Sequence, residues 1–188
     1  IEGRKNGIWT WWYDNGIKQS EGNYYEDEQN GLWSYFSLDG SIAEEITFSG
    51  GKRDGRSTIW LTPEEKKEEK FYKNGKLDGP STYWESGYRN TMTTYKTDVP
   101  EGPWVIWYPN SDQMKEQGFH QNGIKEGLTT YYYDDGTMQR EGFFKEGLPE
   151  DIWTYWNKKG EKDFDFDFGT NLQHISLEDL VERESVFY

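Results

Sequence analysis

The chain repeats with a period of 24 residues, and this period constrains its fold more than any other feature. A glycine stands two residues before a Trp, Ser or Thr six times, and an aspartate takes the seventh place; these anchors are Gly7, Gly31, Gly55, Gly79, Gly102, Gly127 and Asp151. The steps between them are 24, 24, 24, 23, 25 and 24 residues. A large ring follows each anchor by five residues, namely Trp12, Phe36, Trp60, Trp84, Trp107, Tyr132 or Trp156. Such self-similarity is typical of stacked units that pack only against their neighbours.

Most copies contain a turn signal between two segments rich in β-forming residues. Asn15-Gly16 is one such signal, because the left-handed backbone angles of tight turns cost glycine nothing and Asn little. Residues 62–65 in copy three and 109–112 in copy five replace the signal, so these two hairpins should differ locally. The sequence therefore predicts an all-β fold, an elongated antiparallel sheet of about seven tandem 24-residue β-hairpin repeats.

The end of the chain departs from the repeat. We assign residues 1–169 to the repeat array and residues 170–188 to a linker and a C-terminal capping helix. Ser176 can act as N-cap and Ile175 can contact Leu180, which predicts a short helix from 176 to about 186. We expect this helix to cover the open end of the array beside a last strand at residues 162–168. Recognition of a partner by the tail is the alternative.

Aromatic side chains must supply most of the burial. Only 32% of the residues are hydrophobic, against roughly 45–50% in ordinary globular chains, so a thick core is not expected. The chain nevertheless has 10 Trp, 14 Tyr and 10 Phe, far too many rings for a solvated coil.

The chain is strongly acidic, with a formal net charge of -14 and a pI near 4.6. Nucleic acid and anionic membranes would repel it, so we expect no nucleic acid partner and no direct binding to an anionic membrane. The same charge favours another protein with a basic surface. The sequence shows no signal peptide and no apolar run long enough to span a membrane. We expect a soluble protein, either cytoplasmic or exported after removal of an upstream leader.

Chemistry-bearing motifs are missing from the sequence. There is no Cys, and the two histidines, His120 and His174, lie far apart without a metal motif. The chain has no glycine-rich phosphate loop and no serine nucleophile elbow. We therefore interpret both histidines as structural and predict no catalytic residue, no metal, no cofactor and no enzymatic activity.

Two segments carry a family resemblance. Residues 7–16, GIWTWWYDNG, and 31–40, GLWSYFSLDG, resemble the variant MORN repeat of many bacterial proteins, some of which are described as antitoxins of toxin–antitoxin pairs. The resemblance implies a twisted sheet with one hairpin per repeat and a noncatalytic scaffold for protein–protein interaction, antitoxin-like or immunity-like in function. Ser57 and Ser81 depart from the pattern, which favours a ring there.

Side chains alternate between the two faces of a strand, which separates two rows. Residues three and five after each anchor pair a small residue with the recurring ring, and we assign this invariant row to the core. Residues two and four after each anchor vary between copies, as a surface fitted to one partner would. The alternative is that long Lys and Glu side chains cover this second face.

The candidate partner-binding residues come from the variable face and from an acidic row. The rings are Trp9, Trp11, Trp33, Tyr35, Trp104, Trp153 and Tyr155. If exposed, they could bind a protein or, as the alternative function, a carbohydrate or cell-wall glycan. Carboxylates recur near the repeat spacing at Glu21, Glu45, Glu69, Glu116, Glu141 and Asp165. This row predicts either a solvated surface or a docking stripe for a basic protein, with Glu21, Glu45 and Glu141 as its candidate contacts.

Overall fold

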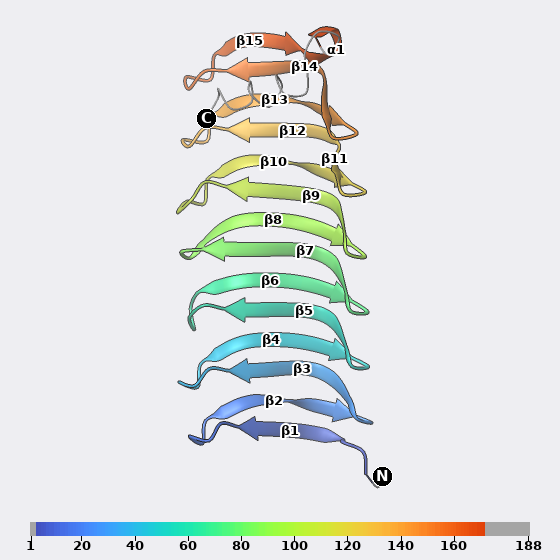
Figure 1. Cartoon of the computed structure of the whole chain (residues 1–188). Helices are drawn as coiled ribbons and strands as arrows, with labels where there is room; N and C mark the ends of the chain where they lie inside the picture. The colour runs from blue at the N-terminus through green and yellow to red at the C-terminus, as the bar shows by residue number, and fades with distance from the viewer. Residues whose placement is uncertain (1–2, 172–188) are drawn as a thin grey trace.

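The structure is a computed structural model that describes residues 3–171. Its strands form one 15-stranded antiparallel sheet in which strands consecutive in sequence lie side by side (Figure 1). The strands are β1 (Gly7–Trp12), β2 (Lys18–Tyr25), β3 (Glu28–Phe36), β4 (Ile42–Ser49), β5 (Lys52–Trp60), β6 (Lys66–Lys73), β7 (Lys76–Glu85), β8 (Tyr88–Lys96), β9 (Val99–Trp107), β10 (Met114–Gln121), β11 (Ile124–Lys125), β12 (Gly127–Tyr132), β13 (Met138–Lys145), β14 (Leu148–Trp156) and β15 (Lys162–Asp167). The predicted all-β array of hairpins is confirmed.

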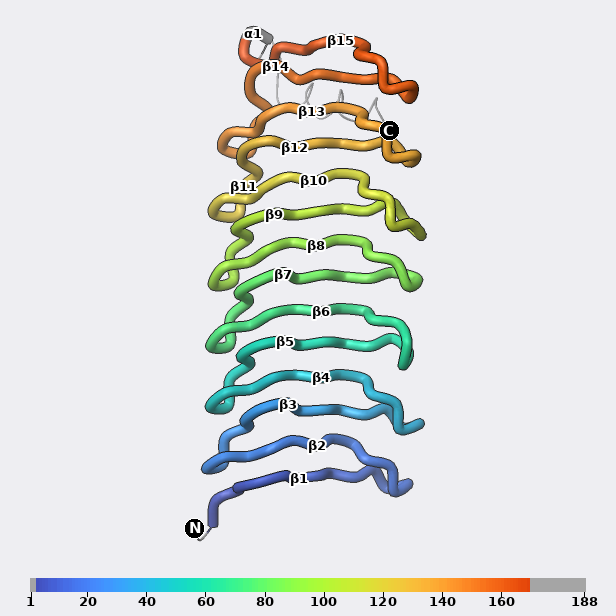
Figure 2. Tube along the Cα trace, turned by 180° about the vertical axis from the view of Figure 1, so that it is seen from behind, coloured from blue at the N-terminus to red at the C-terminus, as the bar shows by residue number. Residues whose placement is uncertain are grey.

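Each copy forms one hairpin, and successive hairpins lie side by side along the sheet. The turns lie along its two long edges (Figure 2). Copy one is β1 and β2, copy five is β9 and β10, and copy seven is β14 and β15; the two-residue β11 pairs only with β10. A single helical turn, α1 (Phe168–Asn171), follows β15. The helix predicted from 176 to about 186 lies outside the described residues.

Two-residue turns join each copy to the next. In the turn after copy three, Asn74 and Gly75 have φ angles of 52° and 84°, the two left-handed angles of a type I′ turn. The turn after copy four has no glycine, and Thr97 and Asp98 adopt φ angles of 53° and 69°. Asp98 there accepts a hydrogen bond of 2.7 Å from the backbone N–H of Leu77, which offsets part of the cost of the left-handed backbone.

The anchors owe their regular spacing to backbone geometry. All seven have a positive φ, including Asp151 at 56°, so the residue that replaces glycine in copy seven keeps the same conformation. The pairing of β2 with β3 skips Gly31 and Leu32, which makes this anchor part of a bulge. Glycine suits such a position because it has no Cβ to strain.

Differences in turn length explain the two irregular steps. Copy four turns with two residues at 86–87, with φ angles of 52° and 81°, and its repeat is one residue short. Copy five closes its longer turn by a 2.9 Å hydrogen bond from the N–H of Tyr108 to the carbonyl of Gln113. Copy three, despite its missing glycine, keeps the ordinary span from Leu61 to Glu65. The local difference expected for copy five is thus a longer loop.

The most buried rings lie on the face that carries residues two and four after each anchor, which we call the tryptophan face. Trp33, Trp104 and Trp153 are only 2%, 3% and 2% exposed. We call the opposite face, which carries residues one, three and five, the threonine face. Its ring row was expected to be the core, and this prediction is wrong: most of these rings are half-buried, Trp12 is 58% exposed, and only Trp107 among them is buried.

Glycines on the neighbouring strands explain why the other face holds the core. Gly22 pairs directly with Trp33, and a Cβ atom on Gly22 would lie 2.2 Å from Trp33 Cδ2. The indole therefore lies flat on bare backbone and is shielded from water. The same close approach recurs in three pairs: Gly22 with Trp33, Gly118 with Trp104, and Gly142 with Trp153.

In copies three and four, where a serine replaces the tryptophan, the residues paired with that serine are larger than glycine. Ser57 pairs with Ile46 and Lys70, and Ser81 pairs with Lys70 and Thr93. Both serines are buried. The larger partners fill the space beside the two serines, so these departures from the repeat pattern change the packing without opening the sheet.

A second ring, from copies one, two and six, packs edge-on against the buried Trp33 or Trp153. Tyr24 meets Trp33 at a ring distance of 5.0 Å and an angle of 83°, a geometry that aromatic pairs favour. In copy five this place belongs to His120, which lies 5.6 Å from Trp104. The neighbouring ring, Phe119, is exposed on the opposite face.

Candidate partner-binding surfaces

The expected binding residues are divided between the two faces of the sheet. The seven candidate rings all lie on the tryptophan face, because they stand two or four residues after an anchor. Glu21 pairs with Thr10 and Ser34, and Glu45 with Ser34 and Thr58; with Glu141, they therefore belong to the threonine face. One partner surface cannot contact both sets at once.

Three of the seven candidate rings are not accessible. Trp33, Trp104 and Trp153 are buried, and the Nε1–H of Trp33 donates a hydrogen bond of 3.1 Å to the carbonyl of Asn23. A continuous stacking platform for a partner, whether protein or glycan, is therefore interrupted at these positions. Of the remaining four, Trp9 is exposed in the first strand, while Trp11, Tyr35 and Tyr155 are half-buried.

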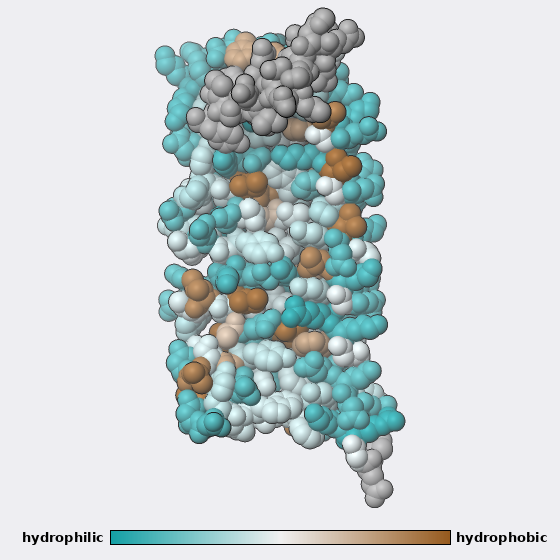
Figure 3. Space-filling model, viewed as in Figure 1, coloured by the Kyte–Doolittle hydropathy of each residue, from teal (hydrophilic) through white to brown (hydrophobic). Residues whose placement is uncertain are grey.

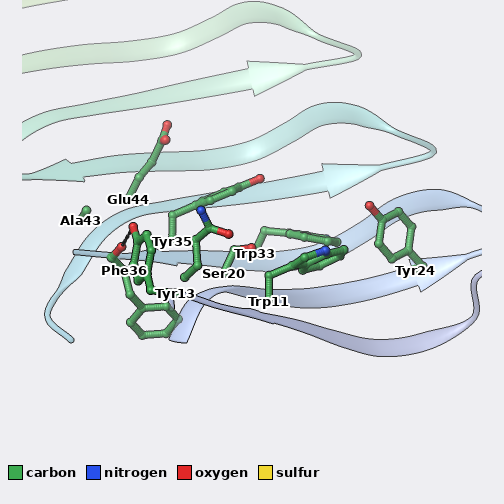
Figure 4. Close-up of a pocket in the computed structure, with 10 residues that line it drawn as sticks. Trp11, Tyr13, Ser20, Tyr24, Trp33, Tyr35, Phe36, Ala43 and Glu44 are labelled. Carbon is green, nitrogen blue, oxygen red and sulfur yellow. Dashed lines mark hydrogen bonds between the residues drawn. The ribbon is translucent and has the colours of Figure 1, made fainter. Parts of the chain in front are cut away.

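A shallow hollow of about 530 Å³ lies where copies one and two meet, and Trp11, Tyr35 and Glu44 contribute to its lining (Figure 4). The hydroxyl of Tyr13 donates a 2.7 Å hydrogen bond to the carbonyl of Phe36, which ties the first copy to the second. Trp11 and Tyr35, two of the expected residues, thus border open space on one side.

Basic side chains cover many rings of the tryptophan face. Lys5 Nζ lies 4.9 Å from the ring centroid of Trp9 and 4.8 Å from that of Tyr24. Lys125 Nζ lies 4.6 Å from the ring of Trp104. Such cations are attracted to ring faces, and their aliphatic stems exclude water from the rings. The chain thus covers much of this face with its own side chains.

Carboxylates on the tryptophan face are paired with these cations. Glu68 forms an ion pair with Lys70, with 2.8 Å between Glu68 Oε1 and Lys70 Nζ. Burial lowers the pKa of Lys70, but hydrogen bonds to Glu68 and Tyr83 outweigh this effect and raise the pKa to about 12. Glu116 belongs to this group, because it pairs with Ile106 and Tyr131. Its expected place in the acidic row of the threonine face is therefore wrong, and Gln117 occupies that position.

The acidic row of the threonine face alternates with small hydroxyl residues. Glu21 accepts hydrogen bonds of 2.7 Å from Lys18 Nζ and 3.0 Å from Thr10 Oγ1. The hydrogen bond from Lys18 and, as the smaller effect, the one from Thr10 lower the pKa of the Glu21 carboxyl. Asp165 is held in the same way in copy seven. Much of the negative charge in this row is thus compensated within the copy.

Two members of the acidic row keep an excess charge. Three residues before Glu45 and Glu141, where other copies have lysine, stand Ile42 and Met138. Neither carboxylate forms an ion pair with another residue in the described range 3–171. Glu141 accepts one hydrogen bond of 3.1 Å from Thr130. These two positions therefore carry the net negative potential of the row.

The threonine face also exposes a column of apolar side chains that sequence reasoning missed. In copies five to seven this column runs across five strands through Pro103, Phe119, Leu128, Phe143 and Ile152, all of them exposed. Phe119 pairs with Pro103, and Leu128 pairs with Phe143. The sequence feature that could have revealed this column is the apolar residue directly after an anchor, such as Leu128 or Ile152. In copies two to four, the same column includes Thr47, Arg56 and Thr94.

Apolar exposure elsewhere is more scattered. On the face seen in Figure 3, hydrophobic side chains of the described residues form separate spots between hydrophilic ones. Singly exposed apolar residues are normal on protein surfaces, whereas contiguous ones mark interaction sites. The five-strand column is therefore the strongest candidate contact surface in the described part of the chain.

Residues 3–171 contain no group of three or more His, Cys, Asp or Glu side chains that could hold a metal ion. His120 lies among packed side chains, where burial and then the nearby charge of Lys125 lower its pKa. A neutral imidazole packed against Trp104 fits a structural role. In the same range, no helix is both long and apolar enough to cross a bilayer.

Comparison with known families agrees with the repeat geometry. The sequence model of the MORN repeat variant matches residues 5–26 and 125–146, which cover the hairpins of copies one and six. The chain is thus similar to this family at two of its seven copies. No curated protein matches the chain. These findings support a MORN-like tandem-repeat scaffold.

Proposed function

We propose that this chain is a noncatalytic scaffold that binds another protein along the threonine face of copies five to seven. The observation that carries the proposal is the exposed apolar column, in which Phe143 and Ile152 are 52% and 56% exposed. Apolar side chains contiguous over several strands lose contact with water when a partner covers them, which stabilises the complex. A rigid sheet presents them with little ordering cost.

The chemistry of the partner follows from the charge beside the column. Glu141 lies on the same face of β13, two residues before Phe143, and is not neutralised by a lysine of its own copy. A partner with a basic, partly apolar surface would complement both features, because opposite charges steer encounter while apolar contacts hold the complex. Nucleic acid and anionic membranes would meet the repulsion of the net charge of -14.

An antitoxin-like or immunity role is the finer form of this proposal. Its support is the similarity of copies one and six to the MORN repeat variant, together with an acidic surface suited to neutralise a basic toxin. Co-expression with a candidate basic toxin encoded nearby tests it. Growth rescue that is lost in Phe143→Ser is the supporting result, and equal toxicity with and without the scaffold contradicts it.

Affinity capture with matched variants tests protein binding itself. Phe143→Ser removes a central residue of the column, and Leu38→Ser, which changes an even more exposed apolar residue in the turn of copy two, is the control. We expect a captured protein to bind wild type and Leu38→Ser alike and to bind Phe143→Ser at least about tenfold more weakly, as loss of a central contact does. Equal binding by all three proteins would remove the threonine face as the site.

Charge reversals then separate steering from contact. Glu141→Lys should slow association with that partner at low salt, and the difference should shrink as salt rises. Glu21→Lys should change the rate less, because Lys18 already neutralises this carboxylate. An association rate indifferent to salt and to Glu141→Lys would show that the acidic row plays no part in docking.

A further inference from the structure

Copy one differs from the other copies at one position of the tryptophan face. In each hairpin, the residue four after the anchor pairs with a residue of the second strand. These second-strand residues are Ser20, Glu44, Glu68, Thr91, Glu116, Arg140 and Phe164. Ser20 is the smallest of them, so copy one lacks a long side chain where most copies have one.

The neighbours of Ser20 are both aromatic. Ser20 pairs with Trp11 in its own hairpin and with Tyr35 in the next one. In copies two to five, one of the two neighbours of the corresponding residue is an isoleucine, either Ile59 or Ile106. A small residue between two rings therefore sets copy one apart from these copies.

Copy six shows what such a pair of rings can hold. Arg140 pairs with Tyr131 in its own hairpin and with Tyr155 in the next one, and its guanidinium carbon lies 4.0 Å from the ring centroid of Tyr131. A guanidinium stacks well on aromatic rings because it is planar and weakly hydrated. The same frame of rings thus holds a guanidinium in copy six and only a serine in copy one.

The space beside Ser20 is open in copy one. Ser20, Trp11 and Tyr35 all line the hollow of about 530 Å³ between copies one and two (Figure 4), and tryptophan is the ring that attracts cations most strongly. Glu44 also lines this hollow. Its Oε1 atom lies 3.6 Å from Arg53, but a carboxylate has sites for more than one donor. The hollow therefore combines aromatic walls with a carboxylate.

We propose that this hollow binds the guanidinium group of an arginine side chain that a partner protein inserts between Trp11 and Tyr35. The guanidinium takes the place that Arg140 has in copy six. Its flat face contacts the rings, and its N–H groups stay free in its plane and donate to the carboxylate of Glu44. The net charge of -14 favours the approach of such a cation.

This site is separate from the surface of the proposed function. It lies on the tryptophan face of copies one and two, whereas the apolar column lies on the threonine face of copies five to seven. The site therefore stands or falls independently of partner binding by the column.

NMR titration of the full-length chain tests the site. The probes are a capped glycyl-arginyl-glycine peptide and its citrulline analogue, which has nearly the same shape without the charge. We expect the arginine peptide to shift the indole N–H of Trp11 and the backbone amides of Ser20 and Glu44 in a saturable way, with a dissociation constant of about 1 mM. The citrulline peptide should bind at least about tenfold more weakly, because it lacks the charged contacts.

Matched variants show whether the peptide occupies the hollow. Ser20→Arg fills the hollow with a guanidinium of the chain itself, as in copy six, and should abolish the saturable shifts. Thr91→Arg adds the same charge at the corresponding position of copy four. It should leave the affinity within about twofold of wild type, because about 29 Å of sheet separates the two positions and salt screens the charge. Glu44→Gln should weaken binding roughly fivefold through loss of a charged hydrogen bond.

A further variant keeps the test valid if Ser20→Arg does not fold. Trp11→Leu removes the ring, leaves Glu44 in place and should abolish the saturable shifts of the amides of Ser20 and Glu44. Equal binding of the two peptides, saturable binding that survives Ser20→Arg or Trp11→Leu, or shifts spread over the whole acidic surface without saturation at Trp11 would overturn the site.

Discussion

The ring of Trp33 lies on the bare backbone of Gly22, so close that a Cβ atom at position 22 would stand 2.2 Å from Trp33 Cδ2. This contact decides which face of the sheet holds its core. A thin sheet cannot bury an indole under a second layer, and the chain instead removes the neighbouring side chain so that the ring can lie flat. The recurrence of the contact at Gly118 and Gly142 makes it a property of the architecture.

Gly22→Ala should lower the free energy of unfolding by about 1–3 kcal/mol, the usual cost of overpacking. Backbone strain is not the cause, because Gly22 does not have a positive φ. Chemical denaturation measures the effect, and Trp33→Ala provides the control background. The alanine should cost clearly less when the indole is absent, and an equal cost in both backgrounds would show that the ring contact is not responsible.

Asp98 should reveal two separate contributions to the turns between copies. Asp98→Gly removes the hydrogen bond to the N–H of Leu77 but relieves the left-handed backbone, whereas Asp98→Ala removes the bond and keeps the strain. We expect Asp98→Ala to lower the unfolding free energy by about 1–2 kcal/mol, close to the cost of a lost cap, and Asp98→Gly by clearly less. Thermal unfolding ranks the two variants; the reverse order contradicts this account of the turn.

His120 should make stability fall at acidic pH. Burial, and then the charge of Lys125, lower its pKa in the folded chain below the ordinary value of 6.5. The neutral form is thus favoured by folding, so this stability is present above pH 6.5 and is lost as pH falls through the lower folded pKa. His120→Phe restores the ring type of copies two and six and should reduce the loss between pH 7 and 5 in denaturation experiments. An unchanged pH profile would contradict the assignment.

The molecule should be elongated in solution. Fourteen strands in sequence along the sheet, at about 4.8 Å each, span about 65 Å before twisting. Small-angle scattering should therefore give a radius of gyration of about 20 Å, well above the roughly 16 Å of a compact domain of this length. A compact value would indicate that the sheet closes or folds back in solution.

The fold could be predicted from sequence because the information is periodic. Anchors, rings and turn residues each recur at a fixed spacing, and the structure shows the backbone reason in the left-handed φ of all anchors, including Asp151. Alternation also assigned the two rows of each first strand to opposite faces correctly. Alternation does not decide which of these faces is buried.

The choice of core face failed for a physical reason. Invariance of the ring five residues after each anchor was taken as a sign of burial, but Trp12 is largely exposed while the variable position holds the buried Trp33. Burial of a side chain depends on the size of the residue that faces it on the neighbouring strand. The small Gly22 faces the large Trp33, and the small Ser57 faces the large Lys70. A comparison of each ring with the residue nine before its anchor would have revealed the glycines.

The residues of the candidate site turned out to lie on two opposite faces of the sheet, and sequence reasoning missed part of this for a related reason. Glu116 and Gln117 show how one residue of offset moves a carboxylate to the opposite face. The irregular turn of copy five causes this offset, and spacing alone does not reveal it.

Footprinting of the captured partner on the intact chain tests the central claim most directly. Hydroxyl-radical labelling followed by mass spectrometry reports the accessibility of each exposed side chain with and without the partner. Our account predicts protection at Phe119, Leu128, Phe143 and Ile152, with little change at Trp9 and Tyr83 on the tryptophan face. Protection confined to Trp9 and Tyr83, with the column of copies five to seven still fully reactive, would contradict it.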